Sequence, residues 1–258
     1  MRVVPRWALL CAGAAPVFLV GGWTLGTARQ PGGFDQVAET ISALAAVGAA
    51  DRWIMTLGLV GLGLCHCATA AALRPLAPGG RALLALGGVG ILAVAALPRP
   101  VDGSSTPHTL AAVVAFAALA VWPALAPTGV GWRPSPPGPR PLGSPAEAQP
   151  AAPNDGSPGS PAEAGPAGPG DGSPVAAGAD RRGRARATTG GYVGGRAGWV
   201  ALSVGLLVPV LWFAVEFVTD GGRVGLSERV AAGVEALCPL LVVGWLRGDR
   251  RSSLLGGE

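Results

Sequence analysis

The sequence predicts an all-α membrane protein built as a bundle of six transmembrane helices. Three observations support this: six long apolar segments, arginines that fall on alternate sides of them, and one long insert almost without large apolar side chains. A helix that rises 1.5 Å per residue needs about 20 residues to cross a hydrocarbon core of about 30 Å. The apolar segments are close to that length and cover residues 7–27, 53–73, 82–97, 109–126, 198–218 and 230–246.

The composition agrees with a membrane protein. Hydrophobic residues make up 50% of the chain and charged residues 13%, whereas a soluble domain carries about 25% charged residues. The net charge is +4, and all 19 basic residues are arginine. Because these arginines flank the apolar segments, we interpret them as topology signals and expect no nucleic-acid partner.

The arginine distribution predicts the orientation of the bundle. Fourteen arginines fall on the side that holds both termini, and the other side has five, namely Arg29, Arg52, Arg99, Arg223 and Arg229. Arginine-rich short loops stay in the cytoplasm. We therefore expect a multi-pass protein of the bacterial cell (plasma) membrane with both termini cytoplasmic.

Two alternatives concern individual segments. The first segment could be a cleaved signal peptide, but it is longer than the usual 7–15 apolar residues and no small-x-small cleavage site precedes Gln30. The third segment is short and glycine-rich, so it could be re-entrant. Omitting it would break the alternation of the arginines, which favours a full span.

The predicted domain organisation has four parts: residues 1–126 with four helices, a linker at 127–197, residues 198–247 with two helices, and a cytoplasmic tail at 248–258. The linker contains a tandem repeat, because residues 143–158 and 159–174 share 13 identities. Alternating proline and glycine cannot bury enough surface to offset the entropy of ordering. We expect a disordered cytoplasmic linker whose basic end either retains the fifth span or contacts anionic headgroups.

No metal site or cofactor is expected. The four cysteines (Cys11, Cys65, Cys67 and Cys238) all fall inside predicted spans. Residues 65–67 read Cys-His-Cys, but successive side chains on a helix point in different directions and do not converge on one ion. His66 is nevertheless of interest, because polar groups deep in a membrane are costly and commonly functional.

The outer face collects the residues that could form a binding site. The topology places five of them near that face, and we expect them to approach one another in a cavity open to the outside: Asp51, Arg52, His108, Glu216 and Glu228. The alternative is structural, with Arg52 paired to a carboxylate at the helix ends. His66 and Glu235 are secondary candidates, since Glu235 lies on the face of Glu228 but about 10 Å deeper. The outer loop could add a short helix capped by Thr40 or Ser42.

Several segments resemble the actinobacterial branch of the family known as domain of unknown function 998. The resemblance rests on GGWTLG (21–26), TISALAAVGAADRWIMT (40–56), CHCATAAAL (65–73), the proline-then-His108 segment, AVWPAL (120–125) and GLSERV (225–230). It covers about residues 5–126 and 196–247. It implies a six-helix integral membrane protein and assigns no activity, although His66, His108, Asp51-Arg52 and Glu228 stand in the matching segments.

Three classes of function remain open. The first is an accessory or binding protein whose outer cavity receives a lipid or small-molecule ligand, and we favour it. The second is a transporter in which Glu216 and Glu235 form a proton relay. The third is an intramembrane hydrolase or transferase that uses His108 with an acidic partner. The two histidines in the chain are too few for an all-histidine zinc site, and no motif identifies a reaction.

Overall fold

The computed structural model describes residues 4–101, 103, 105–127 and 195–255, and within them it is helical, without strands. Six of the helices are long and apolar enough to cross a membrane, so the prediction of a six-helix bundle is confirmed for this part of the chain. The elements are α1 (Arg6–Ala28), α2 (Ile41–Leu44), α3 (Trp53–Ala72), α4 (Pro78–Ala96), α5 (Thr106–Val121), a 3₁₀ turn η1 (Trp122–Leu125), α6 (Arg196–Val218) and α7 (Val224–Leu255).

Several helices begin earlier than hydrophobicity alone indicates. The third segment was expected from residue 82, but α4 begins at Pro78 and has 19 residues, which is enough for a full span. Proline is favoured at the first helical position because an N–H group there has no partner within the helix. Its absence in proline therefore costs no hydrogen bond. A proline also stands in the first turn of α5. At the other end of the chain, α7 continues well past the predicted end at residue 246.

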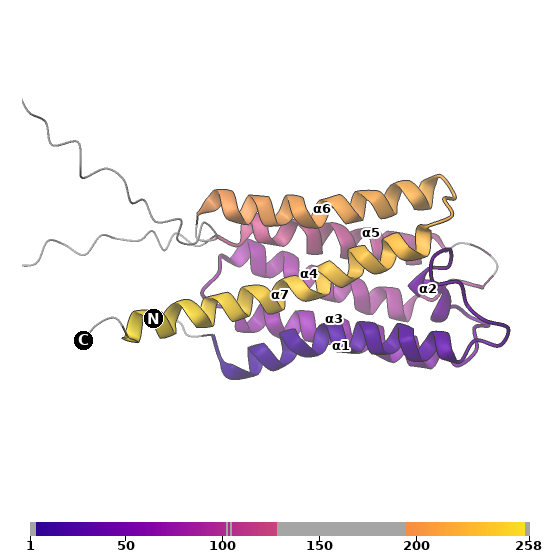
Figure 1. The fold of residues 1–258 in the computed structure, drawn as a ribbon, viewed down its shortest axis with the longest axis horizontal. Coiled ribbons are helices and arrows are strands. Elements are labelled where there is room, and N and C mark those ends of the chain that lie inside the picture. Colours follow the sequence, from indigo (N-terminus) through magenta and orange to yellow (C-terminus); the bar gives the residue numbers. More distant parts are fainter. Residues whose placement is uncertain (1–3, 102, 104, 128–194, 256–258) are drawn as a thin grey trace, which may run out of the picture. The chain divides into compact units, whose positions relative to one another are not determined.

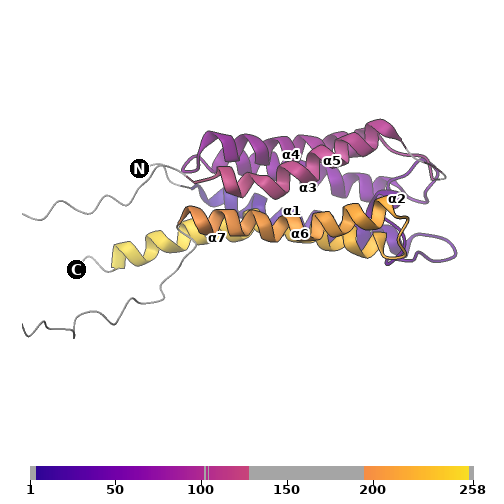
Figure 2. The same cartoon turned by 90° about the horizontal axis from the view of Figure 1, so that it is seen from above.

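The six long helices form a closed ring. Each packs mainly against two neighbours, in the order α1, α3, α4, α5, α6, α7 and back to α1, and α7 also touches α3 and α5. The long helices run side by side along the length of the bundle (Figures 1 and 2). The start of α1 and the end of α7 lie at the same end of this bundle, and α2 lies at the opposite end (Figure 1). The short helix α2 contacts α1 and α7. It therefore sits where the first and last helices of the ring meet.

Close backbone contact between α3 and α4 depends on glycine. A Cβ atom added to Gly88 would lie 2.8 Å from the carbonyl oxygen of Gly63 and 2.7 Å from the Sγ atom of Cys67. Both distances are shorter than normal contacts. Small residues permit this approach between membrane helices, where van der Waals packing supplies much of the association energy.

Helix α6 is anchored mainly through its first half. Its buried residues are Trp199, Ser203 and Leu206. The hydroxyl of Ser203 accepts a hydrogen bond of 2.9 Å from the backbone N–H of Ala124. The ring of Trp199 meets that of Trp245 edge to face, with centroids 6.1 Å apart. From residue 209 to residue 218 every side chain is half-buried or exposed, so this half of α6 packs more loosely against the ring.

The predicted linker lies almost wholly outside the described residues. Its disorder, its tandem repeat at 143–174 and the role of its basic end therefore stay predictions. Residues 127 and 195–197 are the exceptions, and α6 already begins at Arg196.

Candidate functional site

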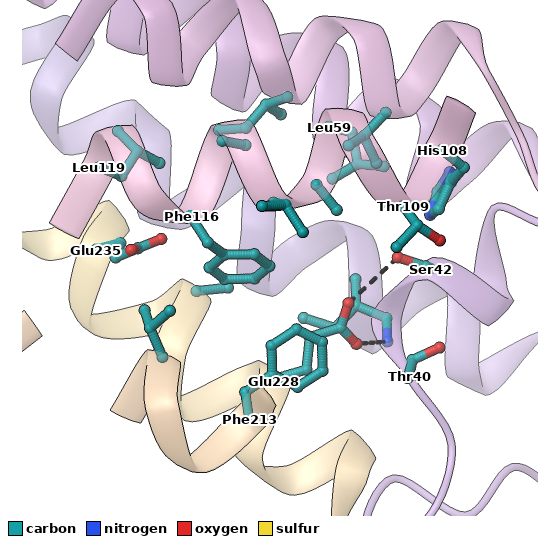
Figure 3. A pocket seen from close by; sticks show the side chains of 18 of the residues that line it. Thr40, Ser42, Leu59, His108, Thr109, Phe116, Leu119, Phe213, Glu228 and Glu235 are labelled. Carbon is teal, nitrogen blue, oxygen red and sulfur yellow. Dashed lines mark hydrogen bonds between the residues drawn. The ribbon is translucent and has the colours of Figure 1, made fainter. Parts of the chain in front are cut away.

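A cavity of about 420 Å³ lies within the ring of helices. All six long helices and α2 contribute to its wall, which is mostly apolar. Its polar side chains form two groups. One group lies next to α2 and includes Ser42, His108, Thr109 and Glu228, and the other consists of His66 and Glu235. Figure 3 shows Glu235 and the first group on opposite sides of the Phe116 ring.

Glu228 joins α7 to the connection between α1 and α3. Its carboxylate accepts hydrogen bonds from the backbone N–H of Ile41 and, at 3.2 Å, from the hydroxyl of Ser42. Ile41 is the first residue of α2, so Glu228 satisfies an N–H group that no residue within the helix can bond. The expected short helix is present, but neither Thr40 nor Ser42 caps it with a side chain, because the carboxylate of Glu228 takes that place.

The next residue, Arg229, holds the same connection from its other side. Its Nη1 atom donates hydrogen bonds to the carbonyl oxygens of Gln36 and Glu39, both at 2.8 Å, and of Gly225 at 2.9 Å. The guanidinium also lies over the rings of Trp23 and Phe34, 6.0 and 5.7 Å from their centroids. In the arginine distribution along the sequence, Arg229 is only a topology signal. Its place beside Glu228, directly before a predicted span, was the signal of a structural role.

His108 lies on the cavity wall. Its Nδ1 atom lies 2.9 Å from the carbonyl oxygen of Leu97. Because a carbonyl can only accept, Nδ1 carries the hydrogen, and Nε2 of the neutral ring is left with a lone pair. The orienting partner of His108 is therefore a backbone carbonyl and not a carboxylate.

His66 and Glu235 form the deeper polar group. Their side chains are 1% and 2% exposed. Nδ1 of His66 lies 2.9 Å from the carbonyl oxygen of Leu62, one turn earlier on α3. Within the described part of the chain, Nε2 of His66 and Oε1 of Glu235 are buried without a hydrogen-bond partner. Such atoms are uncommon in folded proteins, where buried polar groups are nearly always paired.

Three of the five expected site residues lie outside the cavity wall. Asp51 has a left-handed backbone (φ 46°) and accepts a hydrogen bond of 3.2 Å from the indole of Trp53. Arg52 precedes the first turn of α3. Glu216 accepts hydrogen bonds from the indole of Trp212 at 3.2 Å and from the backbone N–H of Arg223 at 3.0 Å. The structure thus brings His108 and Glu228 to one cavity, together with both secondary candidates, and leaves the other three at helix ends.

The cavity reaches the outer surface of the ring between α5 and α6. Its lining includes Val113 of α5 and Val218 of α6, which are 59% and 80% exposed. Phe213 bridges the two helices, with ring centroids 5.2 Å from Phe116 and 5.9 Å from Phe217. This is the loosely packed half of α6, so the gap opens toward the surface that faces lipid in a membrane.

The residues that the structure describes contain no group of three or more histidine, cysteine or acidic side chains placed to hold a metal ion. What they do define is a helical multi-pass membrane protein with an internal, mainly apolar cavity. Residues 12–144 match the family described as Protein of unknown function (DUF998), and the chain belongs to that family. No curated protein and no solved structure matches the chain.

Proposed function

We propose that this protein binds a membrane amphiphile inside its helical ring. The observation that carries the proposal is the apolar cavity of about 420 Å³, which has a lateral opening between α5 and α6 and a polar group next to α2. Ligand pockets commonly have volumes of about 300–1,000 Å³ and mostly apolar walls with a few polar groups. An apolar chain fits the wall between α5 and α6, and a polar headgroup fits beside Ser42, His108 and Glu228.

Selectivity in such a site comes from its polar groups. A lipid tail that leaves the bilayer for an apolar wall gains little, because the hydrocarbon around the protein is equally apolar. Hydrogen bonds to a buried polar group discriminate more strongly between ligands. A ligand that lacks the matching group leaves the buried donor or acceptor of the protein without a partner. The ring nitrogen Nε2 of His108 and the hydroxyls of Ser42 and Thr109 are suitable contacts for a headgroup.

We also place the protein in the plasma membrane, with both termini in the cytoplasm and the α2 end of the bundle outside. The arginine bias of the loops supports this orientation. The amphiphile would then enter from the outer leaflet, because the polar group lies next to α2.

Filling the cavity tests the proposal. Ala112→Phe adds a ring to the cavity wall, whereas Leu110→Phe is a matched control on the same helix whose side chain is 60% exposed. We expect native mass spectrometry of the full chain to show less copurified lipid for Ala112→Phe and unchanged lipid for Leu110→Phe. Equal lipid content in both variants and the parent, with unchanged folding, would contradict an internal binding site.

Transport is a second candidate, favoured by the burial of Glu235 and His66 on the cavity wall. Intramembrane ionisable residues mark proton or substrate pathways in many transporters. A relay between Glu216 and Glu235 lacks this support, because Glu216 does not line the cavity. Proton uptake by liposomes containing the protein, abolished by Glu235→Gln, would favour transport over binding alone.

A further inference from the structure

The two deep side chains offer hydrogen-bond acceptors that have no donor. Nδ1 of His66 is occupied by the carbonyl oxygen of Leu62, so Nε2 of the neutral ring is an acceptor. Oε1 of Glu235 is a carboxyl oxygen and accepts as well. The carbonyl of Glu235 lies near the His66 ring, but no partner meets hydrogen-bonding geometry at Nε2. Among the described residues, then, nothing donates to either atom.

His66 and Glu235 lie near the middle of the bundle. Glu235 stands eleven residues after the start of α7 at Val224, which corresponds to about 16 Å along the helix. His66 stands thirteen residues after the start of α3 at Trp53, or about 20 Å. An unpaired polar group at such a depth is costly, because the hydrocarbon core offers it no hydrogen-bond partner. Both side chains line the cavity.

We propose that the deep pair binds the primary amino group of an amphiphilic amine, whose alkyl chain occupies the apolar part of the cavity. This inference rests on the binding function proposed above and names its ligand class, with the polar end of the ligand at the deep pair and not beside α2. A primary ammonium group has three N–H donors on one atom, and both Nε2 of His66 and Oε1 of Glu235 lack a donor. Its positive charge also compensates a carboxylate, which an alcohol or a hydrocarbon does not do.

The surroundings of Glu235 favour a cation supplied by the ligand. Oε1 receives no hydrogen bond from any described group. Arg99 lies on the cavity wall near Glu228 and His108. Arg229 bonds the connection between α1 and α3. The cavity wall is formed largely by aliphatic residues together with Phe116 and Phe213, which suits an alkyl chain.

Three ligands with the same alkyl chain separate the contributions of N–H or O–H donors, positive charge and apolar contact to binding. Dodecylamine has both N–H donors and charge, dodecyltrimethylammonium has charge alone, and 1-dodecanol has one donor without charge. We expect the full-length protein in lipid nanodiscs to bind dodecylamine at least about tenfold more tightly than either of the others, the effect of one charge-assisted hydrogen bond. Binding is measured by native mass spectrometry and by competition between the probes.

Substitutions at Glu235 test whether the preference for dodecylamine depends on the deep pair. Glu235→Gln keeps the side-chain shape and should abolish the preference for dodecylamine, whereas Glu235→Asp should keep part of it. Glu216→Gln, outside the cavity wall, is the matched control and should bind like the parent. If Glu235→Gln does not fold, binding of the three probes to the parent protein and to Glu235→Asp still tests the proposal.

The outcomes distinguish this proposal from the function on which it rests. Equal binding of the three probes, or of dodecylamine and dodecyltrimethylammonium, overturns the amine site while the apolar cavity still binds amphiphiles. An unchanged preference in Glu235→Gln also overturns it. Failure of all three probes to bind overturns both proposals.

Discussion

Glu228 and Ile41 are 187 residues apart in the sequence, yet the carboxylate of Glu228 accepts the backbone N–H of Ile41 at the start of α2. Arg229 bonds the carbonyl oxygens of Gln36 and Glu39 immediately before α2. Two successive residues of α7 therefore satisfy both kinds of backbone group in one loop. Since Glu228 also lines the cavity, this loop and the polar part of the cavity share one structural support.

Replacing Glu228 should destabilise the bundle. Glu228→Ala removes the acceptor of the Ile41 N–H and the Ser42 hydroxyl, which leaves buried donors unpaired at a cost of about 1–3 kcal/mol. We expect a lower midpoint of thermal denaturation in detergent. Glu216→Ala is the matched control because Glu216 also accepts two hydrogen bonds, but at a more exposed position. A control that loses as much stability as Glu228→Ala would refute a specific role of the α2 contact.

Replacing Arg229 should loosen the connection between α1 and α3. Arg229→Met keeps the apolar stem but removes the donor that serves three carbonyl oxygens, so the loop at residues 29–52 should open more often. Hydrogen exchange of that loop should become faster, with little change in α4 and α5. Arg29→Met, an exposed position in the same region, should exchange like the parent. Uniformly faster exchange over all helices would indicate global destabilisation instead.

The depth of the candidate residues could be predicted from the sequence, but their direction could not. A residue's depth follows from its distance to the end of a span, at 1.5 Å per residue. This placed His108 and Glu228 near one end of the bundle. Glu216 was placed by the same argument, yet it bonds Trp212 and Arg223 and does not line the cavity. Spans that are apolar on all sides carry no periodic pattern to show which face turns inward.

Long-range contacts explain what else the sequence did not show. The sequence predicts a cap of α2 by Thr40 or Ser42, because capping residues are normally local. In the structure Glu228 of α7 accepts the N–H group at the start of α2 instead. His66 and Glu235 lie on separate helices and share the cavity because the ring closes α7 onto α1 and lets it touch α3. Hydrophobicity and loop charge constrain which segments cross the membrane. They do not constrain which helices become neighbours.

The predicted orientation can be tested by labelling single cysteines, in a background without the four native ones. Residue Thr106 is exposed at the start of α5, and Ser144 belongs to the predicted cytoplasmic linker. An impermeant thiol reagent added to intact cells should label a cysteine at Thr106 but not one at Ser144, because the arginine bias retains the linker inside. Labelling of both positions from outside would show that the arginine count is a wrong guide for this chain.

Two glycine substitutions should have opposite effects on stability. Replacement of a helical glycine by alanine stabilises a helix by up to about 1 kcal/mol when the added methyl group has space. A Cβ atom at Gly21 would meet nothing within 4 Å, so Gly21→Ala should leave the denaturation midpoint unchanged or raise it. At Gly88 the added atom would lie 2.8 Å from the backbone oxygen of Gly63. Relieving that contact requires α3 and α4 to separate.

Overpacking of this kind typically costs about 1–3 kcal/mol, which exceeds the gain in helix propensity. Gly88→Ala should therefore lower the denaturation midpoint, and the two variants together separate packing from propensity. The effect should also reach the cavity, because α3 and α4 both contribute to its wall. Parallel stabilisation by Gly88→Ala and Gly21→Ala would mean that the two helices are not held in close backbone contact in the membrane protein.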